Sequence, residues 1–266
     1  MNRKILTAFA AALIVGTASA VTSSNTVCRI VLETTTQDNL ISVPLVGCTT
    51  NHSSGANALI PITNFVMTTG LPASTVLIYN DGSSYKSWQL TNAGGAWTGV
   101  AVVRRDGISY VAGANEGIQR GKAFRLSLPS KPSASGQKIY LCGQYFEAGF
   151  SGDSISSAGS SSAPVYTLVG VGQPAEYTIE TLVSKIGSAQ KGDGIGVPSD
   201  KGMTQYEYDS GWKKVKYTSG TVTLGGIEMT TQTKSFETIP AGDKLPAGAA
   251  FWYITRGASG TRTFTW

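Results

Sequence analysis

The sequence predicts an all-β protein with two related antiparallel β-sandwich or barrel-like modules in tandem and one short helix in the second module. Short apolar or alternating segments are separated by turn-forming residues, which is typical of all-β folds. Glycine is abundant, with 32 of 266 residues, while charged residues make up only 14%. Finally, one order of motifs occurs twice along the chain, and such internal repetition indicates the architecture directly.

The doubled motif opens on an apolar strand and closes on a glycine followed by an aromatic residue. In the first copy its segments lie at residues 40–45, 76–79 and 121–124. In the second copy they lie at residues 166–170, 195–198 and 248–252. The closing glycine permits a tight turn, and the aromatic ring brings a large apolar surface to a small core. We expect Trp97 to correspond to Trp212, and Phe124 to Phe251.

Most of the chain divides into segments with strand character. Residues 40–46 form a continuous apolar run, which is typical of a strand buried on both faces, whereas residues 85–90 and 123–128 alternate. The predicted strands cover residues 27–32, 40–46, 76–79, 85–90, 97–104, 123–128, 139–146, 165–171, 205–208, 212–217, 251–255 and 261–266.

One segment of the second module has helical spacing. Ile179, Leu182, Val183 and Ile186 follow an i, i+3, i+4, i+7 pattern, with Thr178 just before them. An acidic residue in the first turn, a basic residue near the end and a glycine just after it are helix start and stop signals. We therefore predict one short helix over residues 179–186, covering the end of a sheet.

The predicted domains follow from composition. A positive start, an apolar run and Ala18-Ser19-Ala20 make residues 1–20 a signal peptide, cleaved near Ala20, with an uncleaved anchor as the alternative. The first β domain is predicted over residues 21–130 and the second over 164–266. Residues 131–163 hold a connecting strand and a Gly/Ser-rich linker. A single domain with two long surface loops is the alternative.

The charge balance restricts the classes of partner. Loss of Arg3 and Lys4 with the leader lowers the formal net charge from +5 to +3. This mildly basic balance lacks the dense basic stripe of a nucleic-acid-binding protein, so no nucleic acid is expected as a partner. The mature chain has no apolar run long enough for a transmembrane helix. The expected partners are further copies of the chain or surface glycans, and no cofactor is expected.

Three cysteines are available for redox chemistry. Cys28 and Cys48 lie in the same predicted module, and Cys142 lies near its end. Because export favours disulfide formation, we expect a Cys28–Cys48 bridge. Buried thiols that act as small hydrophobic side chains are the alternative.

Four tryptophans are candidates for ligand contact: Trp88, Trp97, Trp212 and Trp252. Core packing is the first interpretation of these rings, because a small β core needs large apolar side chains. The alternative is a row of exposed rings on which sugars stack. Solvent exposure separates the two interpretations, since buried rings favour a structural role.

The sequence contains no recognisable catalytic set. The single histidine, His52, lies in a polar loop, whereas a catalytic triad needs a histidine held against a nucleophile and an acid. A glycosidase needs only two carboxylates, and the candidates for such a pair are Asp193, Asp200, Glu207 and Asp209. Alternatively, Asp193 and Asp200 are turn-forming residues with no catalytic role. We expect the protein not to be an enzyme.

Several segments of the chain resemble a group of uncharacterised exported bacterial β-module proteins. The resemblance lies in motifs at residues 40–45, 139–144, 166–170 and 245–252, the first and last reading Leu-Ile-Ser-Val-Pro-Leu and Leu-Pro-Ala-Gly-Ala-Ala-Phe-Trp. The chain departs from the pattern at Gly170, and at Arg125 where an aromatic residue is usual. The resemblance implies a secreted β-module protein, and no activity is assigned to the group.

These observations together predict a secreted, non-enzymatic structural or adhesive protein of the cell envelope or surface. An extracellular carbohydrate-binding or carbohydrate-degrading module is one alternative. The terminal strand, which ends on Phe264 and Trp266, also leaves a small outer-membrane β-barrel as an alternative. The expected location is the periplasm, the outer surface or the medium.

Overall fold

The structure is a computed structural model of the whole chain. It describes residues 27–45, 59–61, 65–80, 84–101, 103–104, 107–108, 110–111, 117–119, 121–144, 153–157, 159–160, 162–199, 202–224, 227–257 and 259–266. The predicted signal peptide, residues 1–20, lies outside the described residues. The regular secondary structure of the described part is strand except for one short helix, so the predicted all-β class is confirmed.

The first half contains twelve strands in the described part of the chain. They are β1 Val27–Thr34, β2 Asp38–Ser42, β3 Leu59–Pro61, β4 Val76–Asn80, β5 Tyr85–Leu90, β6 Trp97–Gly99, β7 Val103–Arg104, β8 Gly107–Ile108, β9 Tyr110–Val111, β10 Gly117–Gln119, β11 Ala123–Ser127 and β12 Gln137–Gln144. The main sheet has the order β2-β11-β4-β5-β6, and β9 also pairs with β5. Three smaller sheets pair β1 with β12, β3 with β10 and β7 with β8.

The second half contains the helix and the remaining strands. They are β13 Asp153–Ser157, β14 Val165–Val169, β15 Tyr177–Thr178, α3 Ile179–Ser184, β16 Ile186–Gly187, β17 Gly194–Ser199, β18 Gly202–Tyr208, β19 Trp212–Leu224, β20 Ile227–Glu237, β21 Lys244–Leu245, β22 Phe251–Thr255 and β23 Gly260–Phe264. The main sheet has the order β14-β22-β17-β18-β19-β20. Strands β13, β23 and β16 form a second sheet, and β15 pairs with β21.

Strand pairing in the two halves follows the same scheme. The order β2-β11-β4-β5-β6 matches β14-β22-β17-β18-β19, while β1–β12 matches β13–β23 and β3–β10 matches β15–β21. Phe124 and Phe251 are both fully buried near the start of the matching strands β11 and β22. The glycines three residues before them, Gly121 and Gly248, both have φ of 79°, a conformation that glycine adopts without steric cost. Corresponding positions of the two halves are those that this strand matching and the Phe124–Phe251 match bring into register.

The helix follows its sequence signals closely. Thr178 is the N-cap, and its side chain accepts a hydrogen bond from the Thr181 amide at 3.1 Å. Ile179, Leu182 and Val183 are buried against the core, as predicted from their spacing. The helix ends at Ser184, because Ile186 pairs with Phe264 in β16 instead of extending the helix.

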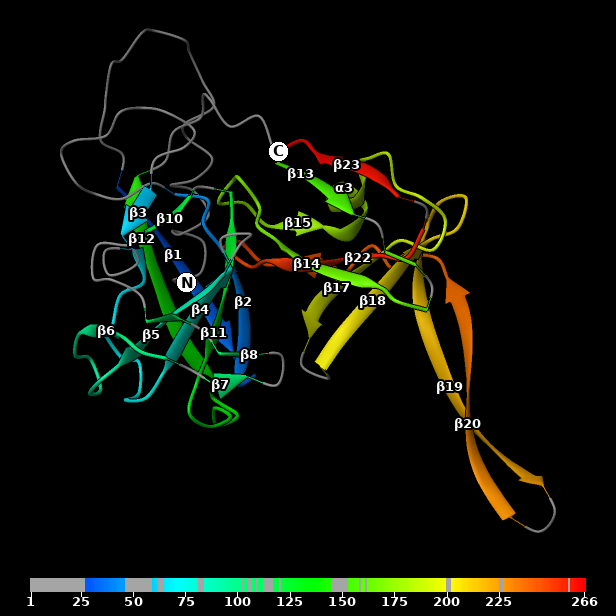
Figure 1. Cartoon of the computed structure of the whole chain (residues 1–266), viewed down its shortest axis with the longest axis horizontal. Coiled ribbons are helices and arrows are strands. Elements are labelled where there is room, and N and C mark those ends of the chain that lie inside the picture. Colours follow the sequence, from blue (N-terminus) through cyan, green and yellow to red (C-terminus); the bar gives the residue numbers. More distant parts are fainter. Residues whose placement is uncertain are drawn as a thin grey trace, which may run out of the picture.

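The two halves lie side by side (Figure 1). They share one continuous hydrophobic core and also join through backbone hydrogen bonds. The Ser42 amide donates to the Gly248 carbonyl at 2.8 Å, and the Ala250 amide donates to the Leu40 carbonyl at 2.9 Å. The Ser42 hydroxyl donates to the Ala249 carbonyl at 2.6 Å and accepts from the Val171 amide at 2.8 Å. The buried serine therefore links both halves at their junction.

The region predicted as a connecting segment has a different organisation. Residues 137–144 form β12, which pairs with β1 and so belongs to the first half. Residues 153–157, predicted as Gly/Ser-rich linker, form β13, which pairs with β23 of the second half. Pairing into sheets overrides the flexible composition here, since the buried Ile155 anchors β13.

Candidate functional site

The outer face of the second main sheet carries a group of large apolar side chains. Strand registers place Trp252 opposite Leu168 and Gly196, and Gly196 opposite Gln205, so these positions share one face. The other face holds the buried rings of Phe251 and Tyr253. We call five residues on the outer side the aromatic face: Tyr166, Met203, Tyr217, Phe236 and Trp252.

Solvent reaches most of the aromatic face. Tyr166 is 55% exposed, Tyr217 50%, Met203 43% and Phe236 41%, and Trp252 is half-buried. Gly196 explains how Met203 and Trp252 come together. A Cβ atom at Gly196 would lie 2.6 Å from the Met203 sulfur and 3.6 Å from the Trp252 Cβ. The missing side chain therefore lets Met203 lean across β17 toward the indole.

A charged cluster adjoins the aromatic face. Glu207 accepts hydrogen bonds from Lys234 and, at 3.5 Å, from Arg256 Nη1. The Lys234 ammonium lies 5.0 Å from the centre of the Phe236 ring, and the Lys213 ammonium lies 6.0 Å from it. These cation–π contacts and ion pairs hold three cations beside one carboxylate, so the cluster is net positive.

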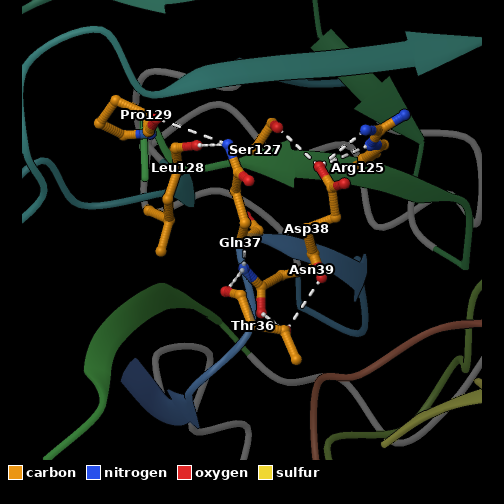
Figure 2. Close-up of polar contacts among 8 residues, drawn as sticks. All are labelled: Thr36, Gln37, Asp38, Asn39, Arg125, Ser127, Leu128 and Pro129. Atoms are coloured by element: carbon orange, nitrogen blue, oxygen red, sulfur yellow. Dashed lines mark hydrogen bonds and ion pairs between the residues drawn. The ribbon is translucent and has the colours of Figure 1, made fainter. Parts of the chain in front are cut away.

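The corresponding face of the first sheet is polar (Figure 2). Asp38, which corresponds to Tyr166, accepts from Arg125 Nη2 at 2.7 Å and from Arg125 Nε at 3.0 Å. Its Oδ1 atom also accepts from the Ser127 hydroxyl at 2.6 Å. Arg125 corresponds to Trp252, so an ion pair stands where the second sheet has two aromatic rings. Farther along this face Ile78 and Ser87 are buried, at 8% and 0% exposure.

The long hairpin β19–β20 is the second feature of the site. It projects away from the rest of the second half as the yellow and orange ribbon of Figure 1. The two strands pair from Lys214–Glu237 to Leu224–Ile227, whereas β19 pairs with β18 only at residues 212–214. Every described side chain from residues 216–221 and 230–237 is exposed. We call residues 215–236 the arm.

The four predicted ligand-facing tryptophans have different positions. Trp88 is 0% exposed and Trp97 6% exposed, and the Trp97 indole donates to the Val66 carbonyl at 3.2 Å. For these two rings the prediction of ligand contact is wrong, because packing in the core leaves no face for a ligand. Trp212 is half-buried and packs against the core, with its ring 5.6 Å from Tyr208. Trp252 lies on the aromatic face.

The carboxylate of Asp193 is committed to structure. The buried Arg262 donates to it from Nε at 2.8 Å and from Nη2 at 3.2 Å, and Tyr253 donates at 2.8 Å. The Gln190 and Gly257 amides donate as well, at 2.9 and 3.2 Å. Burial opposes ionisation, but these hydrogen bonds outweigh it, so the pKa of Asp193 lies below its ordinary value. Burial and the Asp193 charge together raise the pKa of Tyr253.

The other predicted carboxylates have cationic partners of their own where the structure describes them. Asp209 binds Lys191 at 3.0 Å, Glu207 belongs to the cationic cluster, and Asp200 lies outside the described residues. The Lys191 hydrogen bond lowers the pKa of Asp209. Within the described ranges, no group of three or more histidine, cysteine, aspartate or glutamate side chains is placed to hold a metal ion.

The predicted Cys28–Cys48 bridge lies beyond what the structure describes, because Cys48 and the side chain of Cys28 fall outside it. The Cys142 sulfur lies 3.1 Å from the Met67 sulfur. No helix in the described part of the chain is both long and apolar enough to cross a membrane.

A groove of about 300 Å³ lies at the junction of the halves. Its wall includes Thr36 and Asn39 (Figure 2), where the Thr36 hydroxyl donates to Asn39 Oδ1 at 3.2 Å. Asn39 Nδ2 donates back to the Thr36 carbonyl at 3.3 Å. These polar groups are occupied within the turn between β1 and β2, so the aromatic face and the arm are the stronger candidates.

Sequence reasoning missed Tyr166, Met203, Tyr217 and Phe236 as candidate site residues. The alternation of Val215 and Tyr217 on β19, opposite Phe236 and Lys234 on β20, is the signal that could have found two of them. Comparisons of the chain with protein-family models, with curated proteins and with solved structures found no match.

Proposed function

We propose that this chain is an exported, non-enzymatic structural protein of the cell envelope or surface, which associates with further copies of itself through the arm. The proposal includes export through residues 1–20 and an origin of the two halves from one duplicated module. The matching strand order of the two halves supports the duplication. The observation that carries the proposed function is the arm, which projects from the second sheet with exposed side chains.

The arm has the properties of a strand pair that needs a partner. A two-stranded ribbon is marginally stable alone in water. β20 is the last strand of its sheet, and β19 leaves β18 after Lys214, so both outer edges run without a strand neighbour in the described residues. Residues 218–227 contain no charge and no proline, the usual features that protect an exposed edge from pairing.

A second copy of the same chain is the occupant that the arm fits best. If two β20 strands pair antiparallel about a two-fold axis at Thr231, Glu228 of one copy stands opposite Lys234 of the other. Both positions lie on the same face of the hairpin. The sequence positions of β20 therefore place opposite charges across this axis, with Lys234 also bound to Glu207 of its own copy, as suits a closed two-fold interface.

The test is an arm-shortened variant, in which residues 219–232 are replaced by Asn-Gly. The Thr218–Thr233 pair then closes on a two-residue turn, which keeps the hairpin register and the base of the arm. We expect the mature wild-type chain to sediment as a concentration-dependent dimer or larger assembly and the variant as a monomer. A wild-type chain that stays monomeric at high concentration would overturn the proposal.

A single substitution tests the geometry. Thr231→Lys places two like charges against each other at the proposed axis and should weaken association at least tenfold, because directly opposed like charges destabilise strand pairs. Thr261→Lys, on the exposed part of β23, is the matched control and should associate like the wild type. Equal association of both variants would show that the arms do not pair in this way.

A further inference from the structure

We infer that the aromatic face of the second sheet binds an acidic polysaccharide. This binding site goes beyond the proposed association through the arm. It uses the outer side of the sheet and the base of β19–β20, whereas association is centred at Thr231 on the edge of β20, and Lys234 is the residue that the two share. Either activity can fail without the other.

Exposure of the aromatic face is the first argument. Tyr166, Tyr217 and Phe236 each keep at least 41% of their surface in contact with solvent, and Met203 and Trp252 adjoin them. Contiguous exposed apolar groups on a soluble surface mark interaction sites more often than chance exposure does. Aromatic side chains combine large apolar contact area with few rotatable bonds, so they bind at low entropic cost.

The first sheet supplies the second argument, because it shows that the fold does not require aromatic rings here. At the positions of Tyr166 and Trp252 it has Asp38 and Arg125, which bind each other instead of remaining apolar. The same strand scheme therefore forms with a polar outer face. Trp252 also packs against the buried Leu40, Ala123 and Ala250 at the junction of the halves. The exposed rings of Tyr166, Tyr217 and Phe236 have no such packing role in the first sheet's scheme and are better explained by a ligand than by folding.

Charge identifies the class of ligand. Lys213, Lys234 and Arg256 surround a single carboxylate, Glu207, so the face carries excess positive charge. Lys234 and Arg256 are held by their contacts with Glu207, which fixes cations at defined places beside the rings. Apolar sugar faces can stack on the rings while ring carboxylates approach the cations.

The size of the face favours a polymer over a single sugar. The main sheet has six strands from β14 to β20, with Tyr166 at one side and Phe236 at the other. At the usual spacing between neighbouring strands, five intervals span about 24 Å. A chain of linked uronic acids can therefore contact Tyr166, Trp252 and Tyr217 at once.

The experiment measures binding of the mature chain to polygalacturonate, with neutral dextran and a DNA oligonucleotide as the other probes. Trp252→Arg is the decisive variant. The corresponding residue of the first half is already arginine, so the strand scheme tolerates this side chain. We expect at least tenfold weaker binding to polygalacturonate, although the substitution adds a positive charge. Tyr166→Ser should weaken binding several-fold.

Two further variants complete the design. Lys213→Gln should weaken binding and reduce its dependence on salt, because one cation no longer meets the polymer. Tyr140→Ser is the matched control, since Tyr140 is a half-buried ring on β12 that stacks with Arg29, outside the aromatic face. It should bind like the wild type. Thermal unfolding of each variant establishes that it is folded.

Several results would overturn the inference. The wild type could fail to bind polygalacturonate, or Trp252→Arg could bind it as tightly as the wild type or more tightly, which would leave only charge attraction. Equal affinity for dextran would show that the face does not select acidic polysaccharides over neutral ones. Equal affinity for DNA would show that the face binds polyanions in general. Normal sedimentation of Trp252→Arg separates this outcome from failure of the proposed arm association.

Discussion

In the first half the residues just before β4 and near the start of β12 are Thr75 and Ile139, both fully buried. In the second half the residue that matches Thr75 is Asp193, and it forms a fully buried ion pair with Arg262 of β23, the strand that matches β12. The same strand scheme thus forms once with uncharged residues at this place, where the Thr75 hydroxyl donates to the Pro72 carbonyl, and once with an ion pair. An ion pair therefore is not a requirement of the scheme, because the first half folds without one.

On the outer faces of the two main sheets the ion pair is in the first half and the apolar side chains are in the second. The first sheet has an exposed ion pair between Asp38 and Arg125, and the second has the aromatic face at the same positions. The matching strands β6 and β19 also differ in length. β6 has three residues, whereas β19 has 13 and continues into the arm. The second half thus has a buried ion pair where the first half has uncharged residues. It has exposed apolar side chains where the first half has an exposed ion pair. Such a difference is expected where a surface has been adapted for binding.

The largest expected effect comes from breaking the buried ion pair. Arg262→Ile introduces an apolar residue of the type that is buried in β12, but it leaves the Asp193 carboxylate buried without its charged partner. Removal of one member of a buried pair costs about 3–5 kcal/mol of unfolding free energy. Chemical denaturation should show this loss. A loss below about 1 kcal/mol would mean that the pair contributes little.

The double variant Asp193→Thr/Arg262→Ile sharpens the same comparison. It places at position 193 the threonine of the matching position in the first half and leaves no unpaired buried charge, so it should be more stable than Arg262→Ile alone. It should remain below the wild type, because Tyr253 and the amides of Gln190 and Gly257 lose their acceptor. A double variant less stable than Arg262→Ile would contradict this account.

The sequence predicted the strands and the helix better than it predicted these differences. The periodicity of residues 179–186 and the Thr178 cap act locally, so they could be read without a structure. Asp193 was read as a turn former, and its role in binding Arg262 depends on a strand 69 residues away. The arm also escaped prediction beyond residue 217, because its strands are Thr-rich and the described side chains at residues 216–221 and 230–237 are all exposed, which leaves no alternation of apolar and polar residues.

The second prediction concerns the junction, where Ser42 corresponds to Gly170. Ser42→Ala removes the acceptor of the buried Val171 amide and should cost about 1–3 kcal/mol. Gly170→Ala should cost a similar amount for a different reason. Its Cβ would lie 2.2 Å from the Lys122 carbonyl oxygen, and backbone atoms yield little.

The matched control for the junction is Gly211→Ala, whose Cβ would meet no atom within 4 Å. Its unfolding free energy should stay within about 0.5 kcal/mol of the wild type. If Gly170→Ala were equally neutral, the halves would not pack as closely as the described contacts require. Denaturant unfolding of the three variants is the measurement.

The third prediction is a pH dependence that the second half confers. The pKa of Asp193 is lowered, so its contribution to stability is present above about pH 4 and is lost as the pH falls through its folded value. The pKa of Tyr253 is raised, so its contribution is present below about pH 10 and is lost progressively as the pH rises beyond that.

The thermal unfolding midpoint of the wild type should therefore fall at both extremes of pH. In Asp193→Thr/Arg262→Ile the unfolding midpoint should depend less on pH in the acid range, because the carboxylate with the lowered pKa is gone. Its dependence on pH in the alkaline range should weaken too, since the Tyr253 hydroxyl no longer faces a carboxylate. An unchanged profile would assign the pH dependence to groups other than this network.

The smallest expected effect is that of Asp38→Asn on the first sheet. Asp38 and Arg125 form an ion pair with short contacts, but their side chains are 49% and 36% exposed. Water screens such a pair, so its loss should change the unfolding free energy by only about 0–1 kcal/mol, and less in high salt. Denaturation at low and high ionic strength measures this directly. A loss comparable with that of Arg262→Ile would show that exposure does not separate the two pairs, and that the polar face of the first sheet stabilises the fold as much as the buried charge of the second.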